Sequence, residues 1–269
     1  MIIPLREGAS QEAIHGHETF LSDLPVARNI RLIRNVTAPS LTVYTPEPSA
    51  ATRTGVILCP GGSFHTLPHW DDPEINGIAR RLTEHGLTVF VLRYRLAPTP
   101  RTDEEFMRLA SASAIMDAVK AQSRVTRDDP FQALRIIRER ASTWGLDPER
   151  VGMMGFSAGG LLTTCAATGY DAATRPAFAA PIYGTAFDEY TVPTDAPPLF
   201  IAFASDDEGI GVVPRCLGLY SAWQTAGHPV EMHVYAQGGH GFAAAPPELP
   251  CGTWMDRYLH WLRSLGFLS

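Results

Sequence analysis

The stretch Gly155-Phe156-Ser157-Ala158-Gly159 lies where a buried strand should end and a helix should begin. Residues 150–154 are typical of a short apolar strand, and residues 161–167 are good helix formers. A G-x-S-x-G sequence at such a junction forms a tight elbow that presents the serine Oγ at the C-terminal edge of a sheet. The stretch therefore predicts that Ser157 is the nucleophile of an acyl-transfer reaction; the alternative is that it only caps the following helix.

The rest of the chain alternates between apolar runs and helical patterns. With 269 residues and 45% hydrophobic content, it can bury the core of one α/β domain over residues 1–269. The alternation predicts a mostly parallel central sheet flanked by helices, with right-handed crossovers. The expected strands are 41–44, 55–59, 87–92, 151–156, 178–183, 199–204 and 230–235. The expected helices are 74–85, 103–121, 131–144, 158–168, 213–226 and 253–265.

One segment, residues 99–129, is longer than a strand-to-helix connection needs and contains a helical pattern of its own. Two interpretations fit it. It is an insertion that lies over the active-site face, or it is another crossover helix.

Charge and cysteine content limit the possible partners. A net charge of −6 offers no basic face for a phosphate backbone, so nucleic acid is not an expected partner. No stretch reaches membrane-spanning length, and no signal segment is visible; we expect a soluble protein that is cytoplasmic, or secreted after removal of a signal. The oligomeric state stays open. The four cysteines show no C-x-x-C spacing, so we expect no metal site, and only Cys216 and Cys251 are candidates for a disulfide.

A serine nucleophile needs a base within hydrogen-bond reach and a carboxylate that orients the base. In α/β-hydrolases the three groups follow the order serine, acid, histidine. Asp206 and Asp207 follow the expected strand 199–204, and His240 lies in a glycine-rich stretch after strand 230–235. Because the C-terminal ends of parallel strands share one edge of a sheet, we expect these residues on the same rim as Ser157. From the residues alone, Asp206 and Asp207 are both candidates for the acid.

The oxyanion hole is expected in the turn Cys59-Pro60-Gly61-Gly62-Ser63-Phe64, which follows the strand 55–59. This turn is similar to the HGGG-type turn of lipases and esterases. The backbone N–H groups of Gly62 and Ser63 would join that of Ala158 in binding a tetrahedral oxyanion. A plain Pro-Gly-Gly turn explains the same residues, and the position of the turn after an early strand favours the functional interpretation.

Seven stretches spread along the chain are together typical of one known family. They are 39–44 (PSLTVY), 59–62 (CPGG), 92–98 (LRYRLAP), 144–148 (WGLDP), 155–160 (GFSAGG), 238–242 (GGHGF) and 261–262 (WL). With them the chain resembles the small acetylxylan-esterase-like α/β-hydrolases, close to those that remove ester groups from plant cell-wall polysaccharides. The resemblance implies a serine esterase fold, a preference for short acyl groups, and no metal or cofactor.

The resemblance also implies residue roles. The family's catalytic serine falls on Ser157 and its histidine on His240. Its acid is the second aspartate of a D-D-x pattern that precedes V-P, which favours Asp207 over Asp206.

The chain departs from the family pattern in two places around the expected site. Ser63 stands where a glycine is usual, which narrows the pocket mouth, and Gly209-Ile210-Gly211 is inserted before Val213-Pro214. The insertion keeps Asp206 as the alternative acid. The segment 99–129 is also longer than is usual in the family, so the natural substrate need not be xylan.

We therefore expect a serine esterase that hydrolyses short-chain carboxylic esters, including acetyl groups on carbohydrates, through an acyl-enzyme. The partner is then a small-molecule or carbohydrate ester. Four side chains are candidates to line the alcohol-side entrance: Phe64, His65, Trp70 and Trp254. The alternatives are a serine peptidase of the prolyl-oligopeptidase type and a non-catalytic binding module on a hydrolase scaffold.

Overall fold

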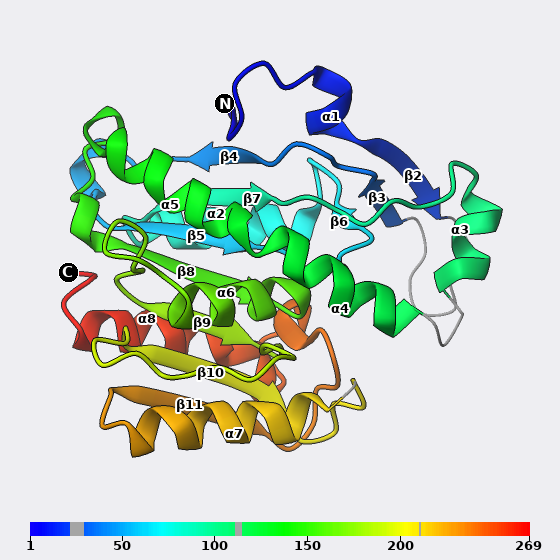
Figure 1. The fold of residues 1–269 in the computed structure, drawn as a ribbon. Coiled ribbons are helices and arrows are strands. Elements are labelled where there is room, and N and C mark those ends of the chain that lie inside the picture. The colour runs from blue at the N-terminus through cyan, green and yellow to red at the C-terminus, as the bar shows by residue number, and fades with distance from the viewer. Residues whose placement is uncertain (22–29, 111–114, 210) are drawn as a thin grey trace.

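An eight-stranded sheet runs through the centre of the molecule, in the order β1-β4-β7-β5-β8-β9-β10-β11 (Figure 1). The computed structural model describes residues 1–21, 30–110, 115–209 and 211–269. The strands of the sheet are β1 (Ile2–Pro4), β4 (Ser40–Tyr44), β7 (Thr88–Arg93), β5 (Gly55–Cys59), β8 (Val151–Phe156), β9 (Ala179–Ile182), β10 (Leu199–Ala204) and β11 (Val230–Tyr235).

The six strands from β7 to β11 are parallel, and β4 and β1 extend the sheet in antiparallel pairing. Every residue of β5, β7, β8 and β10 is buried. Strands covered on both faces need apolar side chains in both directions, which is why these segments are continuous apolar runs. The predicted fold class, a mostly parallel sheet flanked by helices, is confirmed.

Alternate residues of one strand show how the helices cover the sheet. Val56 and Leu58 pack into a core cluster with residues of α2 and α8, whereas Ile57 and Cys59 pack into another with residues of α5 and α6. Because successive side chains of a strand point to opposite faces, these helices lie on opposite faces of the sheet. The helices are α1 (Gln11–His15), α2 (Pro73–Glu84), α3 (Asp103–Ala110), α4 (Ile115–Thr126), α5 (Asp128–Glu139), α6 (Ala158–Thr168), α7 (Val212–Thr225) and α8 (Trp254–Ser264). Within the described ranges, none combines the length and apolarity that crossing a bilayer requires.

The structure differs from the expected elements in two regions. The expected helix 103–121 is described as two helices, α3 and α4, and residues 111–114 lie outside the described part. The chain before β4, for which no strand or helix was predicted, forms β1, α1 and two strands of a second sheet, β2 (His17–Leu21) and β3 (Ile30–Arg34), which continues with β6 (Leu67–Pro68). β1 pairs with β4 and β3 pairs with β6, both distant in the sequence, so no local pattern predicts these short strands.

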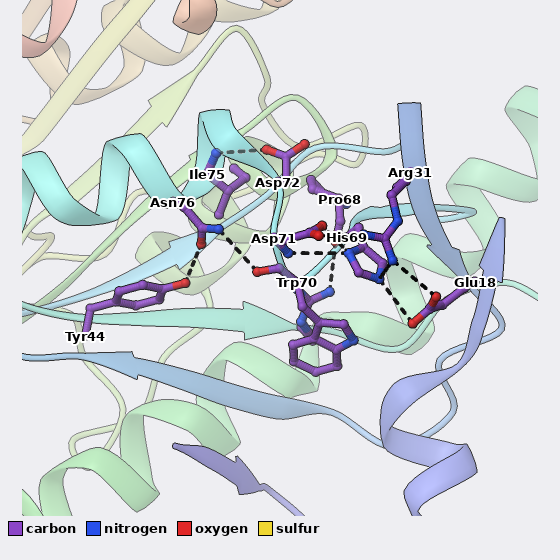
Figure 2. Close-up of polar contacts among 11 residues, drawn as sticks. Glu18, Arg31, Tyr44, Pro68, His69, Trp70, Asp71, Asp72, Ile75 and Asn76 are labelled. Carbon is purple, nitrogen blue, oxygen red and sulfur yellow. Dashed lines mark hydrogen bonds and ion pairs between the residues drawn. The ribbon is translucent and has the colours of Figure 1, made fainter. Parts of the chain in front are cut away.

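A polar cluster joins this second sheet to the chain that leads into α2 (Figure 2). The imidazole of His69 lies between two carboxylates: Nε2 is 3.1 Å from Glu18 on β2, and Nδ1 contacts Asp71. These contacts with His69 lower the pKa of both carboxyl groups. Arg31 of β3 also pairs with both acids. The cluster therefore ties β2 and β3 to the body of the molecule.

Arg34, at the end of β3, fastens the second sheet to the start of the segment 99–129. Its side chain has no exposed surface, and its guanidinium lies 4.6 Å from the ring centroid of Phe106. It donates hydrogen bonds to Thr19, Thr99, the carbonyls of Pro100 and Arg101, and Asp103. Figure 1 shows the result: α3 stands beside β2 and β3 at the end of the sheet toward which the parallel strands point.

Replacing Arg34 should destabilise the protein substantially. In Arg34→Met the buried hydroxyl of Thr19 and the part-buried carbonyl of Pro100 lose their donor, and an unsatisfied buried group costs roughly 1–3 kcal/mol. We expect the free energy of unfolding, measured by urea titration, to fall by about 3 kcal/mol. Arg101→Met, which removes an exposed side chain from the same segment, is the matched control and should change it by less than about 0.5 kcal/mol. Equal effects of the two substitutions would contradict the anchoring role of Arg34.

Candidate active site

Ser157 lies at the junction of β8 and α6 with φ 53° and ψ −115°, a conformation that is strained for a residue other than glycine. Its N–H donates to the carbonyl of Ile182 on β9, 3.1 Å away. Glycines surround the turn because the backbone segments nearly touch. A Cβ on Gly159 would lie 2.0 Å from the carbonyl oxygen of Cys59, and one on Gly184 would lie 2.1 Å from that of Ser157. Gly184 was not singled out from the sequence; its only signal there is a glycine shortly after an apolar strand.

Ser157, His240 and Asp207 form a continuous chain of hydrogen bonds. The Oγ of Ser157 is 2.8 Å from Nε2 of His240, and Nδ1 of His240 is 3.0 Å from Oδ2 of Asp207. The side chain of Asp207 is fully buried, whereas that of His240 is 40% exposed. Asp207 follows β10 and His240 follows β11, two adjacent parallel strands. The fold thus brings together the three residues that the sequence placed on one rim.

Gly209 explains one departure from the family pattern. Its N–H donates to Oδ1 of Asp207 at 2.7 Å. A Cβ at this position would lie 2.7 Å from that oxygen and 3.0 Å from Nδ1 of His240. A glycine here therefore both fixes the carboxylate and leaves room for the imidazole to reach it. Ile210 lies outside the described residues.

Asp206 has a separate set of contacts. Its carboxylate accepts hydrogen bonds from the N–H groups of Gly239, at 2.8 Å, and Gly238, at 3.2 Å. These backbone donors, that of Gly239 most strongly, lower the pKa of the Asp206 carboxyl group. Asp206 therefore holds the loop that carries His240, while Asp207 contacts the imidazole itself.

Tyr183, directly after β9, supports the imidazole from the side. Its buried ring meets His240 edge-on, with 5.2 Å between ring centroids, and meets Phe242 at 5.0 Å. Burial raises the pKa of its phenol well above the usual value. Sequence reasoning missed Tyr183, because a tyrosine at the end of a buried strand resembles any core aromatic residue.

The expected oxyanion turn has three consecutive residues with positive φ: 131° at Gly62, 52° at Ser63 and 60° at Phe64. The carbonyl of Gly62 accepts hydrogen bonds from the N–H groups of His65 and Thr66, both at 3.0 Å. A Cβ on Gly62 would lie 2.0 Å from the carbonyl oxygen of Thr66, so the turn needs glycine there.

A cavity of about 240 Å³ opens above Ser157. Ser63 and Ala158 line it with Ser157 and His240; Gly62 forms the turn behind Ser63. Val119 of α4 also lines it, so the segment 99–129 does border the site. The other lining residues are Phe64, Leu161, Tyr183, Gly184, Thr185, Phe187, Gly209, Val212 and Arg215.

Of the four aromatic residues expected at the entrance, the structure brings only Phe64 to this cavity. Trp254 is 2% exposed and packs edge-on against Phe156 in the core. His65 is buried, with Nδ1 2.7 Å from the carbonyl oxygen of Ser63. Trp70 lies under the guanidinium of Arg93, 3.4 Å from the ring centroid, beside the polar cluster around His69 (Figure 2). A motif places a residue near a site but does not say to which side its ring turns.

A second, larger cavity of about 600 Å³ lies between α5, α6 and the loop after β9. It shares Leu161 and Phe187 with the cavity above Ser157. Two ion pairs line it, Arg124 with Asp188 and Arg135 with Asp171. Its charges are therefore largely compensated within the protein.

The four cysteines are free thiols, so Cys216 and Cys251 do not pair. Across the described part of the chain, no group of three or more His, Cys, Asp or Glu side chains is arranged to hold a metal ion.

Removing the Asp206 carboxylate should loosen the loop that carries His240. In Asp206→Ala the N–H groups of Gly238 and Gly239 lose their acceptor, so their exchange with solvent deuterium should become faster, by about fivefold or more if the bonds contribute 1 kcal/mol. Asp206→Asn retains one acceptor oxygen and should give an intermediate rate. The measurement is amide exchange by NMR, with the amides of β10 as the internal reference. Unchanged exchange at both glycines would show that another group holds the loop.

Comparison with known proteins places the chain in a family of hydrolases. The model of the dienelactone hydrolase family matches residues 71–267. The acetylxylan esterase of Xylanibacter ruminicola is 27% identical in an alignment of 258 positions that covers 84% of this chain and 47% of that protein, so the chain spans about half of the relative's length. An acetyl ester-xyloside bifunctional hydrolase from Caldicellulosiruptor lactoaceticus has a similar structure, with a TM-score of 0.69 and 22% identity over 100% of this chain and 97% of the other.

A propionate-bound esterase from Thermogutta terrifontis superposes with a TM-score of 0.65 and 16% identity, over 96% of this chain and 97% of that one. These structural matches show that the fold is that of the α/β-hydrolases. Because the family model covers most of the sequence, including the residues around Ser157, Asp207 and His240, the chain belongs to the dienelactone hydrolase family.

Proposed function

We propose that this protein is a serine esterase that hydrolyses short-chain carboxylic esters through an acyl-enzyme. The observation that carries the proposal is the continuous hydrogen-bond chain from Ser157 through His240 to the buried Asp207. A relative that is an acetylxylan esterase, and structural neighbours that are esterases, support the same reaction class.

In the proposed reaction His240 acts as the general base. Nδ1–H donates to Asp207, which leaves Nε2 to take the proton of Ser157 as its Oγ attacks the ester carbonyl. Asp207 stabilises the imidazolium that forms, and His240 then protonates the leaving alcohol. Water repeats the sequence on the acyl-enzyme and releases the acid.

The oxyanion of each tetrahedral intermediate would be bound by backbone N–H groups of the turn 62–63 and of Ala158. Ala158 is the first residue of α6, so the positive end of the helix dipole adds to its N–H. The strained φ values of Ser63 and Phe64 are consistent with a turn shaped for this purpose.

The size of the cavity supports a short acyl group. At about 240 Å³ it is smaller than the usual range of roughly 300–1,000 Å³ for pockets that enclose drug-sized ligands. Acetyl esters, including those on carbohydrates, fit this volume.

Ser157→Ala should abolish ester hydrolysis without unfolding the protein, because it removes the nucleophile but almost no volume. We expect kcat for 4-nitrophenyl acetate to fall by a factor of order 10⁴ or more. Ser205→Ala, at an exposed serine after β10, is the control and should remain active with the same melting temperature. Aminoacyl anilides are assayed in parallel to test the peptidase alternative. If the enzyme hydrolyses the anilides faster than the esters, the result favours a peptidase.

The two adjacent aspartates should differ in severity. Asp207→Asn leaves the imidazole without the carboxylate that sets its tautomer, a change that costs about 10⁴ in the chymotrypsin-type triad. Asp206→Asn keeps an acceptor for the His240 loop, so kcat should stay within about tenfold of the wild type. If Asp206→Asn proves the more severe, Asp206 is the orienting acid. If both are mild, the carboxylate lies elsewhere.

A further inference from the structure

Arg215, in the first turns of α7, forms part of the wall of the cavity above Ser157. The proposed reaction does not use it. Its side chain is half-buried, and its guanidinium lies over the ring of Phe187, 4.6 Å from the centroid. A positive charge therefore stands within a small and otherwise largely apolar wall that includes Leu161 and Val212.

This charge has no counter-ion in the described part of the chain. No carboxylate there forms an ion pair with Arg215, and its Nε is buried without a hydrogen-bond partner. Burial lowers the pKa of the guanidinium, and no carboxylate acts in the opposite direction. Two arginines of the larger neighbouring cavity differ from Arg215, because Arg124 pairs with Asp188 and Arg135 with Asp171.

An uncompensated, partly desolvated guanidinium responds to whatever enters the cavity. An alkyl chain packed against it would remove its remaining water and offer no hydrogen bond in return, which is unfavourable. A carboxylate, carbonyl or hydroxyl oxygen at the same place would supply the missing acceptor, and carboxylates match the guanidinium fork best. The wall thus discriminates by polarity as well as by size.

We propose that Arg215 determines which esters the site accepts. An acyl or alcohol chain, here called an arm of the ester, is accepted if it ends before the guanidinium or brings an oxygen acceptor to it. An alkyl arm that reaches the guanidinium without an acceptor is excluded. This inference rests on the esterase function proposed above. It makes the preference for short acyl groups a consequence of charge as well as volume.

The test uses two pairs of esters matched in chain length. On the acyl side, 4-nitrophenyl hexanoate is compared with the 4-nitrophenyl half-ester of adipic acid. On the alcohol side, hexyl acetate is compared with 6-acetoxyhexanoate, and the acid released by hydrolysis is measured in a pH-stat. For each pair the ratio of kcat/KM, charged ester over alkyl ester, is measured after subtraction of spontaneous hydrolysis. The pair with the larger ratio identifies the arm that reaches Arg215.

We expect the wild type to favour the charged ester by about tenfold or more in at least one pair, the factor that a charge-assisted hydrogen bond supplies. Arg215→Met keeps the length of the side chain without its charge and should reduce that ratio by about the same factor. Arg215→Lys should keep the wild-type order. Arg135→Met, in the neighbouring cavity, is the matched control and should leave both ratios unchanged.

Ratios that agree within about twofold between the wild type and Arg215→Met, in both pairs, would overturn the role of Arg215. Melting temperatures verify folding, and Arg215→Gln replaces Arg215→Met if the latter does not fold. Failure of the proposed function looks different: hydrolysis that survives Ser157→Ala refutes the serine mechanism while the ratios still test Arg215. Absence of hydrolysis with every ester overturns both proposals.

Discussion

The close approach of backbone segments around Ser157 is the constraint on which the rest of the site depends. The strand β8, the start of α6 and the residues after β5 and β9 meet so tightly that a single methyl group on Gly159 or Gly184 would collide with a carbonyl oxygen. This packing holds Ser157 at a positive φ that an isolated chain would leave. The buried sheet provides the stability that compensates for this strain, and the rigid turn provides a fixed direction for the Oγ.

The remaining groups reach Ser157 because parallel strands end on one edge. Adjacent strands β10 and β11 carry Asp207 and His240, so a short shift between their loops would break the contact between acid and base. Asp206 limits such a shift by binding the backbone of the His240 loop. Two neighbouring carboxylates thus have different contacts: one is buried and meets the imidazole, and the other is exposed and joins the two loops.

The sequence predicted the parts of this arrangement that depend on local patterns. Continuous apolar runs identified the central strands, and the elbow motif identified Ser157, because both follow from a few neighbouring residues. Residues that act through distant contacts left no such pattern. Arg34 meets its partners in the segment 99–103, and β1 exists only through pairing with β4. Tyr183 and Gly184 also need the folded neighbours of Ser157 to reveal their role. The same limit explains the placement of Trp254 in the core, since its position in the sequence does not specify the direction of its ring.

In the function proposed for this site, Arg215 adds selectivity that the groups around Ser157 do not provide. The hydrogen-bond chain at Ser157 would serve any ester whose carbonyl reaches it, so discrimination has to come from the walls. Phe187 separates the small cavity from the larger one and also stacks on Arg215, so one aromatic ring both limits the volume and holds the charge in place. An apolar residue at 215 would have made the wall permissive for alkyl chains. With a guanidinium there, a ligand that covers the wall must supply an acceptor or leave the charge desolvated, and the cavity then selects by chemistry as well as by size.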